Sequence, residues 1–116
     1  MASAGGDWKD MYYAAERGDI ACVAYHLSQG VDVDYQHPEA MMSALVAATL
    51  QGQTAVVQLL LEHGADPNMP AQMGGLTALQ AAQQIQHPAL EQLLQTFGAT
   101  PSVKPHRSFW ERWLAL

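Results

Sequence analysis

The order of apolar and polar residues in this chain repeats with a period of 34 residues. This is the spacing that separates Gly30 from Gly64 and Gly64 from Gly98. The segments SALVAATLQG and TALQAAQQIQ, which start at Ser43 and Thr77, align at that spacing, and MYYAAERG occupies the corresponding place in a first copy. Gly18 and Gly52 recur in the same register. A period of this length is typical of stacked supersecondary units, so the sequence predicts three copies of one unit.

The middle copy predicts two short helices and a turn. Ser43 has the character of an N-cap before an alanine-rich helix, and Gly52 fits a left-handed residue after its end. The second helix, about residues 54–63, is apolar at positions 56, 57, 59, 60 and 61, too many for one solvent-facing stripe. Both of its sides must therefore be covered, as happens when repeats stack. Gly64 ends this helix, and the Asp-Pro-Asn that follows supplies turn residues.

The outer copies follow the same plan with differences. In the third copy, His87-Pro88 places proline in the first turn of a helix, where its missing N–H costs nothing. In the first copy, Tyr25, His26 and Ser28 make the second helix more polar. That composition suits a terminal repeat with one face in water.

The three copies resemble the ankyrin repeat family. Its pattern of Thr-Pro-Leu-His, paired alanines, a glycine, an apolar helix and Gly-Ala-Asp-x-Asn is matched best by residues 43–68, moderately by 77–99 and weakly by 11–34. The resemblance implies an all-α fold, an α-solenoid of about three ankyrin-type helix-turn-helix repeats with a short C-terminal capping helix. The predicted organisation is a flexible N-terminus (1–7), repeats at 8–34, 43–68 and 77–98 within 8–98, and a Pro-containing spacer with an aromatic helix (99–116).

The chain departs from the family pattern at two kinds of position. Val46 and Gln80 replace the histidine that pairs with the threonine at the helix start, and this loss is expected to weaken the hydrogen bonds there. Gln86 replaces a glycine, so a left-handed backbone at this residue would be strained. The hairpins at 35–42 and 69–76 each have one residue more than the family's usual length.

Composition and charge narrow the class of protein. The 116 residues are 49% apolar and 14% charged, which indicates one globular domain rather than a disordered chain. The formal net charge of -6 argues against binding to nucleic acid, because phosphate neutralisation needs many Lys and Arg side chains. Residues 1–98 carry two basic and ten acidic side chains, whereas 99–116 carry three basic and one acidic. The sequence therefore predicts an acidic body followed by a basic tail.

The single cysteine and the absence of targeting patterns in the sequence favour a reducing compartment. Cys22 has no second cysteine to pair with, and its apolar neighbours predict a buried, inert thiol. The sequence shows no signal-peptide pattern and no apolar run long enough to span a membrane. We therefore expect a soluble, cytoplasmic protein.

No arrangement of residues in the sequence points to catalysis. The five histidines lack the i, i+3 or i, i+4 spacing of helical metal ligands. His26 and His37 flank a turn, but nothing in the sequence brings them to Cys22 as a metal site. Gly74-Gly75 is a lone pair without the rest of a phosphate-binding motif. We expect no enzymatic activity, no metal and no cofactor.

The resemblance instead implies a non-catalytic protein–protein interaction module. Ankyrin repeat proteins hold partners with their hairpin tips and the exposed, concave side of each first helix. The matching positions here are Glu16, Arg17, Glu39, Met42, Leu50, Gln51, Met73, Leu76, Gln84 and Ile85. The apolar members of this set are expected to form one strip that binds a protein partner with basic character around an apolar centre. The alternative is that some of them, Met42 and Leu76 above all, pack inside the stack.

The tail RSFWERWLAL, residues 107–116, is the second candidate for docking. On a helix, Phe109, Trp113 and Leu116 share one face, with Trp110 and Leu114 beside it. One interpretation is that this helix caps the third repeat, whose apolar side chains need a cover. The alternatives are docking on a partner or on another subunit, which would make the chain a self-associating structural or regulatory subunit, and interfacial membrane binding. Membrane binding is the least favoured, because a short helix with few cations is a weak anchor.

Overall fold

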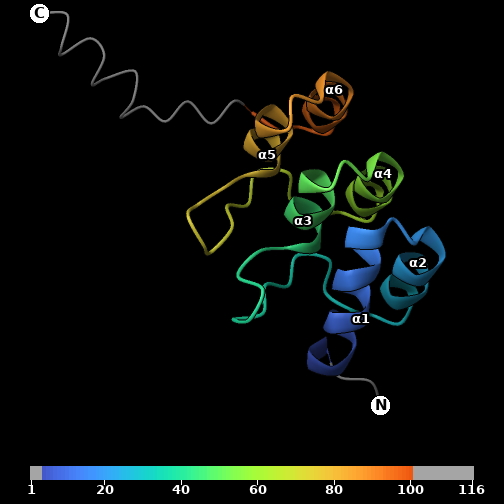
Figure 1. Ribbon diagram of the computed structural model, residues 1–116. Coiled ribbons are helices and arrows are strands. Elements are labelled where there is room, and N and C mark those ends of the chain that lie inside the picture. The colour runs from blue at the N-terminus through green and yellow to red at the C-terminus, as the bar shows by residue number, and fades with distance from the viewer. Residues whose placement is uncertain (1–3, 101–116) are drawn as a thin grey trace, which may run out of the picture.

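The computed structural model describes residues 4–100 as six helices joined by loops (Figure 1). The helices are α1 (Ala4–Arg17), α2 (Ile20–Ser28), α3 (Ala44–Leu50), α4 (Thr54–Glu62), α5 (Ala78–Gln84) and α6 (Pro88–Thr96). Within this stretch the chain forms no strand. The odd-numbered helices pack against one another in one layer, and α2, α4 and α6 form a second layer. The predicted all-α solenoid of helix pairs is confirmed.

The core lies between the two layers and between neighbouring repeats. In α4, Val56, Val57, Leu60 and Leu61 are all buried, so this helix is covered on both sides, as its sequence predicts. Small alanines in α3 and α5 are buried as well, which lets neighbouring helices approach closely. The stack is therefore held by contacts between each repeat and the next one along the chain.

The amino-terminal ends of α3 and α5 show how the structure accommodates the residues that differ from the expected repeat pattern. Ser43 is the predicted N-cap of α3, and its hydroxyl oxygen accepts a hydrogen bond from the backbone N–H of Val46 at 3.3 Å. At α5 the expected weakening does not occur, because Gln80 takes over the missing role. Thr77 Oγ1 accepts from the N–H of Gln80 at 3.2 Å, and Gln80 Oε1 accepts from the N–H of Thr77 at 3.0 Å. This reciprocal pair is a capping box, which satisfies two N–H groups at the helix start.

The first helix is longer than its alignment with the other repeats indicates. It begins at Ala4, inside the segment expected to be a flexible N-terminus, instead of near Met11. Trp8, Met11 and Ala15 are buried along one side of it, at the i, i+3, i+7 spacing of an amphipathic helix. The additional turns therefore bring a large indole to the core.

His26 differs from its expected place in water. It is 8% exposed and aligns with Leu60 in the second repeat and with Leu94 in the third, both fully buried leucines of the core. Its Nδ1 has no hydrogen-bond partner among the described residues. The first repeat therefore carries a polar ring at a position where the other two carry leucine.

Among residues 4–100, two residues other than glycine adopt a left-handed backbone, and each has a glycine at the equivalent position of another repeat. Gln86 has a φ of 56°, where the corresponding Gly52 has 70°, so the strain expected for Gln86 is present. Met41 has a φ of 58°, and its counterpart in the next repeat, Gly75, has 68°. The fold thus imposes the same backbone at equivalent positions whichever residue is present.

Side chains in the turns that follow the second helices join neighbouring repeats. Asp34 Oδ1 accepts from the N–H of Asp66 at 2.9 Å, and Asn68 Oδ1 accepts from the N–H of Thr100 at 2.9 Å. The Asn68 Nδ2 also donates to the carbonyl of Gly98 at 3.1 Å. Burial, together with the charges of Asp32 and Asp66, raises the pKa of the Asp34 carboxyl above its usual value, although the hydrogen bond from the Asp66 backbone opposes this.

None of the described helices is long and apolar enough to cross a membrane. The proposed C-terminal capping helix at 107–116 lies outside the described residues.

The substitution His26→Leu is expected to stabilise the fold. It replaces a buried polar atom that lacks a partner with the residue found at both equivalent positions, and should raise the free energy of unfolding by about 1–3 kcal/mol. Urea denaturation followed by circular dichroism measures this. A lower denaturation midpoint for His26→Leu would show that the imidazole makes a stabilising interaction.

The substitution Gln86→Gly should also stabilise the chain, by about 0.5–1 kcal/mol, because glycine adopts the left-handed backbone without a Cβ clash. The matched control is Gly52→Ala at the equivalent position. An added Cβ there would meet its nearest neighbour at 3.8 Å, so only backbone strain should lower the stability. Opposite shifts of the two thermal midpoints are expected, and equal shifts would contradict the assignment of strain.

The substitution Asp34→Asn is expected to raise stability slightly at neutral pH, by at most about 0.5 kcal/mol because solvent screens this partly exposed carboxyl, while keeping the acceptor for the Asp66 N–H. The raised pKa means that the folded state favours the protonated Asp34 carboxyl. The stabilisation is therefore complete below pH 3.8 and is lost as the pH rises through the folded-state pKa. Denaturation at pH 3 and pH 7 should show the gain at pH 7 only. Asp34→Ala is the control and should destabilise at both pH values, because it leaves the N–H of Asp66 without its acceptor.

Candidate partner-binding surface

Two hairpins project from the layer of α1, α3 and α5, on the side away from α2, α4 and α6 (Figure 1). They are bonded to each other. The N–H of Met73 donates to the carbonyl of Met41 at 3.0 Å. The side-chain amide of Gln36 bridges from the first hairpin to the second, donating to the carbonyl of Pro70 at 3.0 Å and accepting from the N–H of Gln72 at 2.9 Å. These bonds fix the two tips relative to each other.

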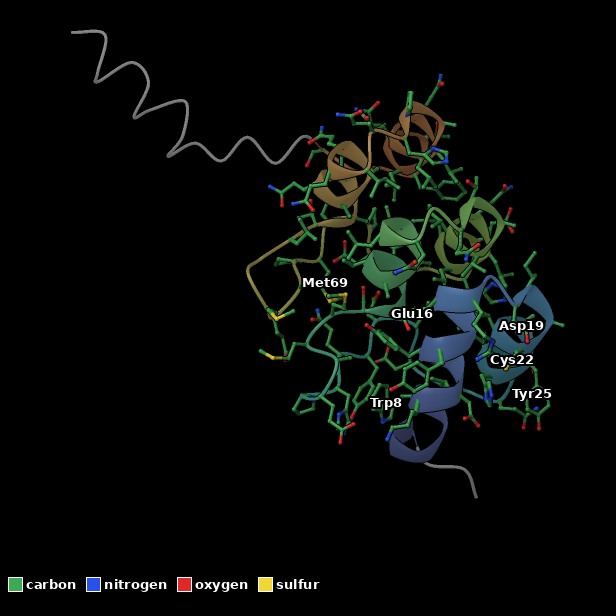
Figure 2. All side chains as sticks on the ribbon, in the orientation of Figure 1. Trp8, Glu16, Asp19, Cys22, Tyr25 and Met69 are labelled. Atoms are coloured by element: carbon green, nitrogen blue, oxygen red, sulfur yellow. The ribbon has the colours of Figure 1, made fainter. Side chains whose placement is uncertain are left out.

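Methionine side chains gather on this pair of hairpins. Met41 is 37% exposed and Met73 is 54% exposed, and the bond between their backbones places them together at the tips. Met69 lies between the hairpins (Figure 2), and its sulfur accepts from the Nε2 of Gln36 at 3.0 Å. Exposed methionine is unusual on a surface, and its flexible thioether adapts to varied apolar partners.

The structure divides the predicted apolar strip into two parts. Met73 is exposed at the hairpin tip. Met42, Leu50, Leu76 and Ile85 are half-buried and pack against the core. The alternative of internal packing therefore applies in part to these four side chains, which form a partly exposed apolar floor beside the tips.

The polar members of the predicted set lie around this floor. Arg17, Glu39, Gln51 and Gln84 are exposed, and Glu16 is half-buried. Gln51 is the C-cap residue of α3 and Gln84 is the last residue of α5, so both lie at the carboxyl ends of neighbouring helices, next to Leu50 and Ile85. Arg17 makes an exposed ion pair with Asp19 at 3.5 Å, which leaves its guanidinium accessible to other groups.

An aromatic cluster lies under the first hairpin and was not predicted from the sequence. The ring of Trp8 is stacked on that of His37, with centroids 4.3 Å apart and an interplanar angle of 9°. The Nδ1 of His37 accepts from the N–H of Glu39 at 3.0 Å, and Lys9 pairs with the Glu39 carboxylate at 3.6 Å. Trp8 holds the hairpin against α1, at the place that Met42 occupies one repeat further along the chain. The alignment of Trp8 with Met42 is the sequence feature from which the packing of Trp8 under the hairpin could have been predicted.

One tyrosine beside this cluster has an altered acidity. Burial, the charge of Glu16 and the neighbouring Tyr13 raise the pKa of Tyr12 to about 12. The phenol is therefore neutral at physiological pH, and it serves as part of the packing under the hairpin.

The residues considered for metal binding, His26, His37 and Cys22, each pack in a different environment. His37 is stacked on Trp8, and His26 is buried in α2. Cys22 is half-buried instead of fully buried, and packs against the core. Among residues 4–100 no group of three or more His, Cys, Asp or Glu side chains is placed to hold a metal ion.

Comparisons with known proteins give a consistent result. The family model described as ankyrin repeats (3 copies) matches residues 11–104. A crystal structure of an ankyrin repeat domain from Acinetobacter baumannii AYE is similar, with a TM-score of 0.71 and 33% sequence identity. The similarity covers 78% of this chain and 47% of that one, so the chain spans about half the length of that domain. The search of curated proteins found no match.

Proposed function

Since this chain belongs to the ankyrin repeat family, whose members are generally protein–protein interaction modules, we propose that it binds a protein partner on the paired hairpins and the adjacent apolar floor. The proposed contact residues are Glu16, Arg17, Glu39, Met42, Leu50, Gln51, Met73, Leu76, Gln84 and Ile85, together with Met41. This function requires no catalysis and no cofactor.

The observation that supports this surface most strongly is the bonding between the hairpins. Gln36 and the backbone bond from Met73 to Met41 hold the two exposed methionine side chains at neighbouring tips before any partner arrives. Little conformational entropy is then lost from the hairpin backbones on binding, which favours affinity. A rigid surface that exposes apolar side chains is the arrangement expected of a binding site.

Charge supports a partner with basic character. Residues 1–98 carry ten acidic and two basic side chains, so the field around the stack is negative. Such a field speeds the approach of a positively charged partner, and the effect falls as salt rises. The partner that fits this surface therefore has an apolar centre surrounded by Lys or Arg side chains.

Substituting Met73 with Asp tests the proposal. We expect Met73→Asp to weaken capture of the partner by at least about tenfold, because it places a charge in the apolar centre of the interface. The measurement is affinity capture from a native lysate on immobilised wild-type and variant chains, at low and high salt. Met73 is exposed, so circular dichroism should show unchanged helical content.

The matched control is Ile20→Asp. Ile20 is 44% exposed at the start of α2, in the layer away from the hairpins. An acidic residue in the first turn of a helix is favourable, so this variant should fold and bind as the wild type does. Equal capture by Met73→Asp and wild type would exclude the hairpin tips as the binding site.

A further inference from the structure

The two ends of the stack differ in chemistry, as a comparison of equivalent positions in the three repeats shows. Residues that face the preceding repeat are covered in the second and third repeats and uncovered in the first. Ala47 and Ala81 are buried, but their counterpart Tyr13 is 47% exposed. Leu59 and Leu93 are half-buried against the core, but their counterpart Tyr25 is 59% exposed.

Cys22 belongs to the same end. Its counterparts Val56 and Leu90 are fully buried, whereas Cys22 is half-buried. Figure 2 shows Cys22 and Tyr25 on α2, with Tyr25 on the side away from α4. We call Tyr13, Cys22 and Tyr25 the amino-terminal end face. Its side chains are more exposed than their counterparts, and Asp10, whose counterparts Ala44 and Ala78 are buried, is exposed one turn before Tyr13 on α1.

The opposite end of the stack is polar. Thr49 is fully buried, but its counterpart Gln83 in the third repeat is exposed. Leu61 is buried, but its counterpart Gln95 is exposed. In the same way the half-buried Glu91 stands where the second repeat has a fully buried valine. Phe97 is 37% exposed in this repeat, but its counterparts His63 and Gln29 are exposed too, so its exposure does not distinguish this end. The positions that are buried in the second repeat and more exposed in the third therefore carry polar side chains, which water can solvate.

This difference between the two ends of the stack indicates where the apolar tail can dock. Residues 107–116 carry Phe109, Trp113 and Leu116 at the spacing of one helical face. The polar end of the third repeat, from which the tail leaves, offers little to such a face. The amino-terminal end face offers two exposed tyrosines and a thiol. We propose that segment 107–116 of one copy of this chain docks on the amino-terminal end face of a second copy.

Charge favours the same pairing. The tail from 99 onward carries three basic side chains and one acidic. Asp10 and Asp19, on α1 and before α2, are exposed acidic residues of the repeat that bears the end face. The acidic residues beside the end face attract a basic ligand, whereas two copies of this face, each with its neighbouring carboxylates, would repel each other.

The length of the linker favours docking on a second copy over docking on the same chain. The N–H of Thr100 is bonded to Asn68, which fixes the point where the tail leaves the stack. From Thr100 to Arg107 the chain spans at most about 25 Å. Two steps of ~10 Å separate the helices of the third repeat from those of the first, and the chain must also pass round the first repeat to reach its outer side. Passing round that repeat adds roughly another 10 Å, so the path of about 30 Å exceeds the reach of the linker.

Each copy then has one tail and one receiving face, so the contact is head-to-tail. Such contacts produce rings or open chains, not only dimers. A segment of ten residues buries little area, which places the interaction in the weak class of interfaces. Assembly should therefore depend on concentration in the micromolar range and above.

Analytical ultracentrifugation of three full-length chains tests this proposal. The wild type should grow in mass with concentration, whereas Trp113→Asp and Tyr25→Lys should each remain monomers. An equimolar mixture of the two variants should form a 1:1 dimer and stop there. In that dimer the intact tail of Tyr25→Lys occupies the intact face of Trp113→Asp, and no functional pair of sites is left.

Ile20→Lys is the control. Ile20 is an exposed apolar residue of the same helix, but its counterparts Thr54 and Pro88 are exposed too, so it is outside the end face. This variant should assemble as the wild type does. Met73→Asp should also assemble normally, which separates this proposal from the partner-binding function of the hairpins. Thermal unfolding at low concentration confirms that each variant is folded.

The only cysteine of the chain supplies a second measurement. A synthetic peptide of residues 107–116, added to Trp113→Asp at ten times its dissociation constant, should slow reaction of Cys22 with a thiol reagent about tenfold. The peptide with aspartate at position 113 should have no effect. A monomeric wild type at every concentration would overturn the proposal, as would a mixture that stays monomeric. Self-association by Trp113→Asp alone would show that two end faces pair with each other instead.

Discussion

The structure depends on the burial of apolar side chains between neighbouring helix pairs. Neither helix of a repeat is long enough to be stable alone, and α4 has more apolar surface than one partner can cover. Each repeat is therefore stabilised by the next one along the chain. The hydrogen bonds that the N–H groups of Asp66 and Thr100 donate to the side chains of Asp34 and Asn68 add a second connection between successive repeats. The proposed binding function depends on the rigidity that these contacts give to the hairpins.

A stack held together in this way tolerates single residues that are locally unfavourable. His26 occupies a leucine position, and Gln86 and Met41 adopt backbones for which glycine is better suited. Each of these unfavourable residues lies in one repeat, and the contacts of the neighbouring residues compensate for its cost. Met41 is the instructive case, because its unfavourable backbone lies at a hairpin tip and its side chain is exposed there. Strain at an exposed position of this kind is often linked to binding.

The same architecture creates two kinds of surface. Hairpins from successive repeats lie side by side, and Gln36 bridges them, so their tips form a preformed pair, which is the surface proposed to bind a partner. The two ends of the described stack differ from these hairpins and from each other. A polar end, with Gln83 and Gln95, is compatible with water, whereas Tyr13 and Tyr25 leave an apolar end exposed. The two proposals made here concern these two surfaces and rest on separate residues.

The sequence by itself determined the repeat, the order of the helices and most of their ends. These depend on local properties, such as the N-cap at Ser43, the left-handed glycines and the apolar period, which act over a few residues. Only the tertiary structure decided which apolar side chains are covered. Met42 and Met73 look alike in the sequence, yet one is packed against the core and the other is exposed. The stacking of Trp8 on His37 and the bridging role of Gln36 also join residues far apart in the chain. Exposure and long-range contacts depend on the neighbouring repeats, and no local pattern specifies what those neighbours place opposite a given side chain.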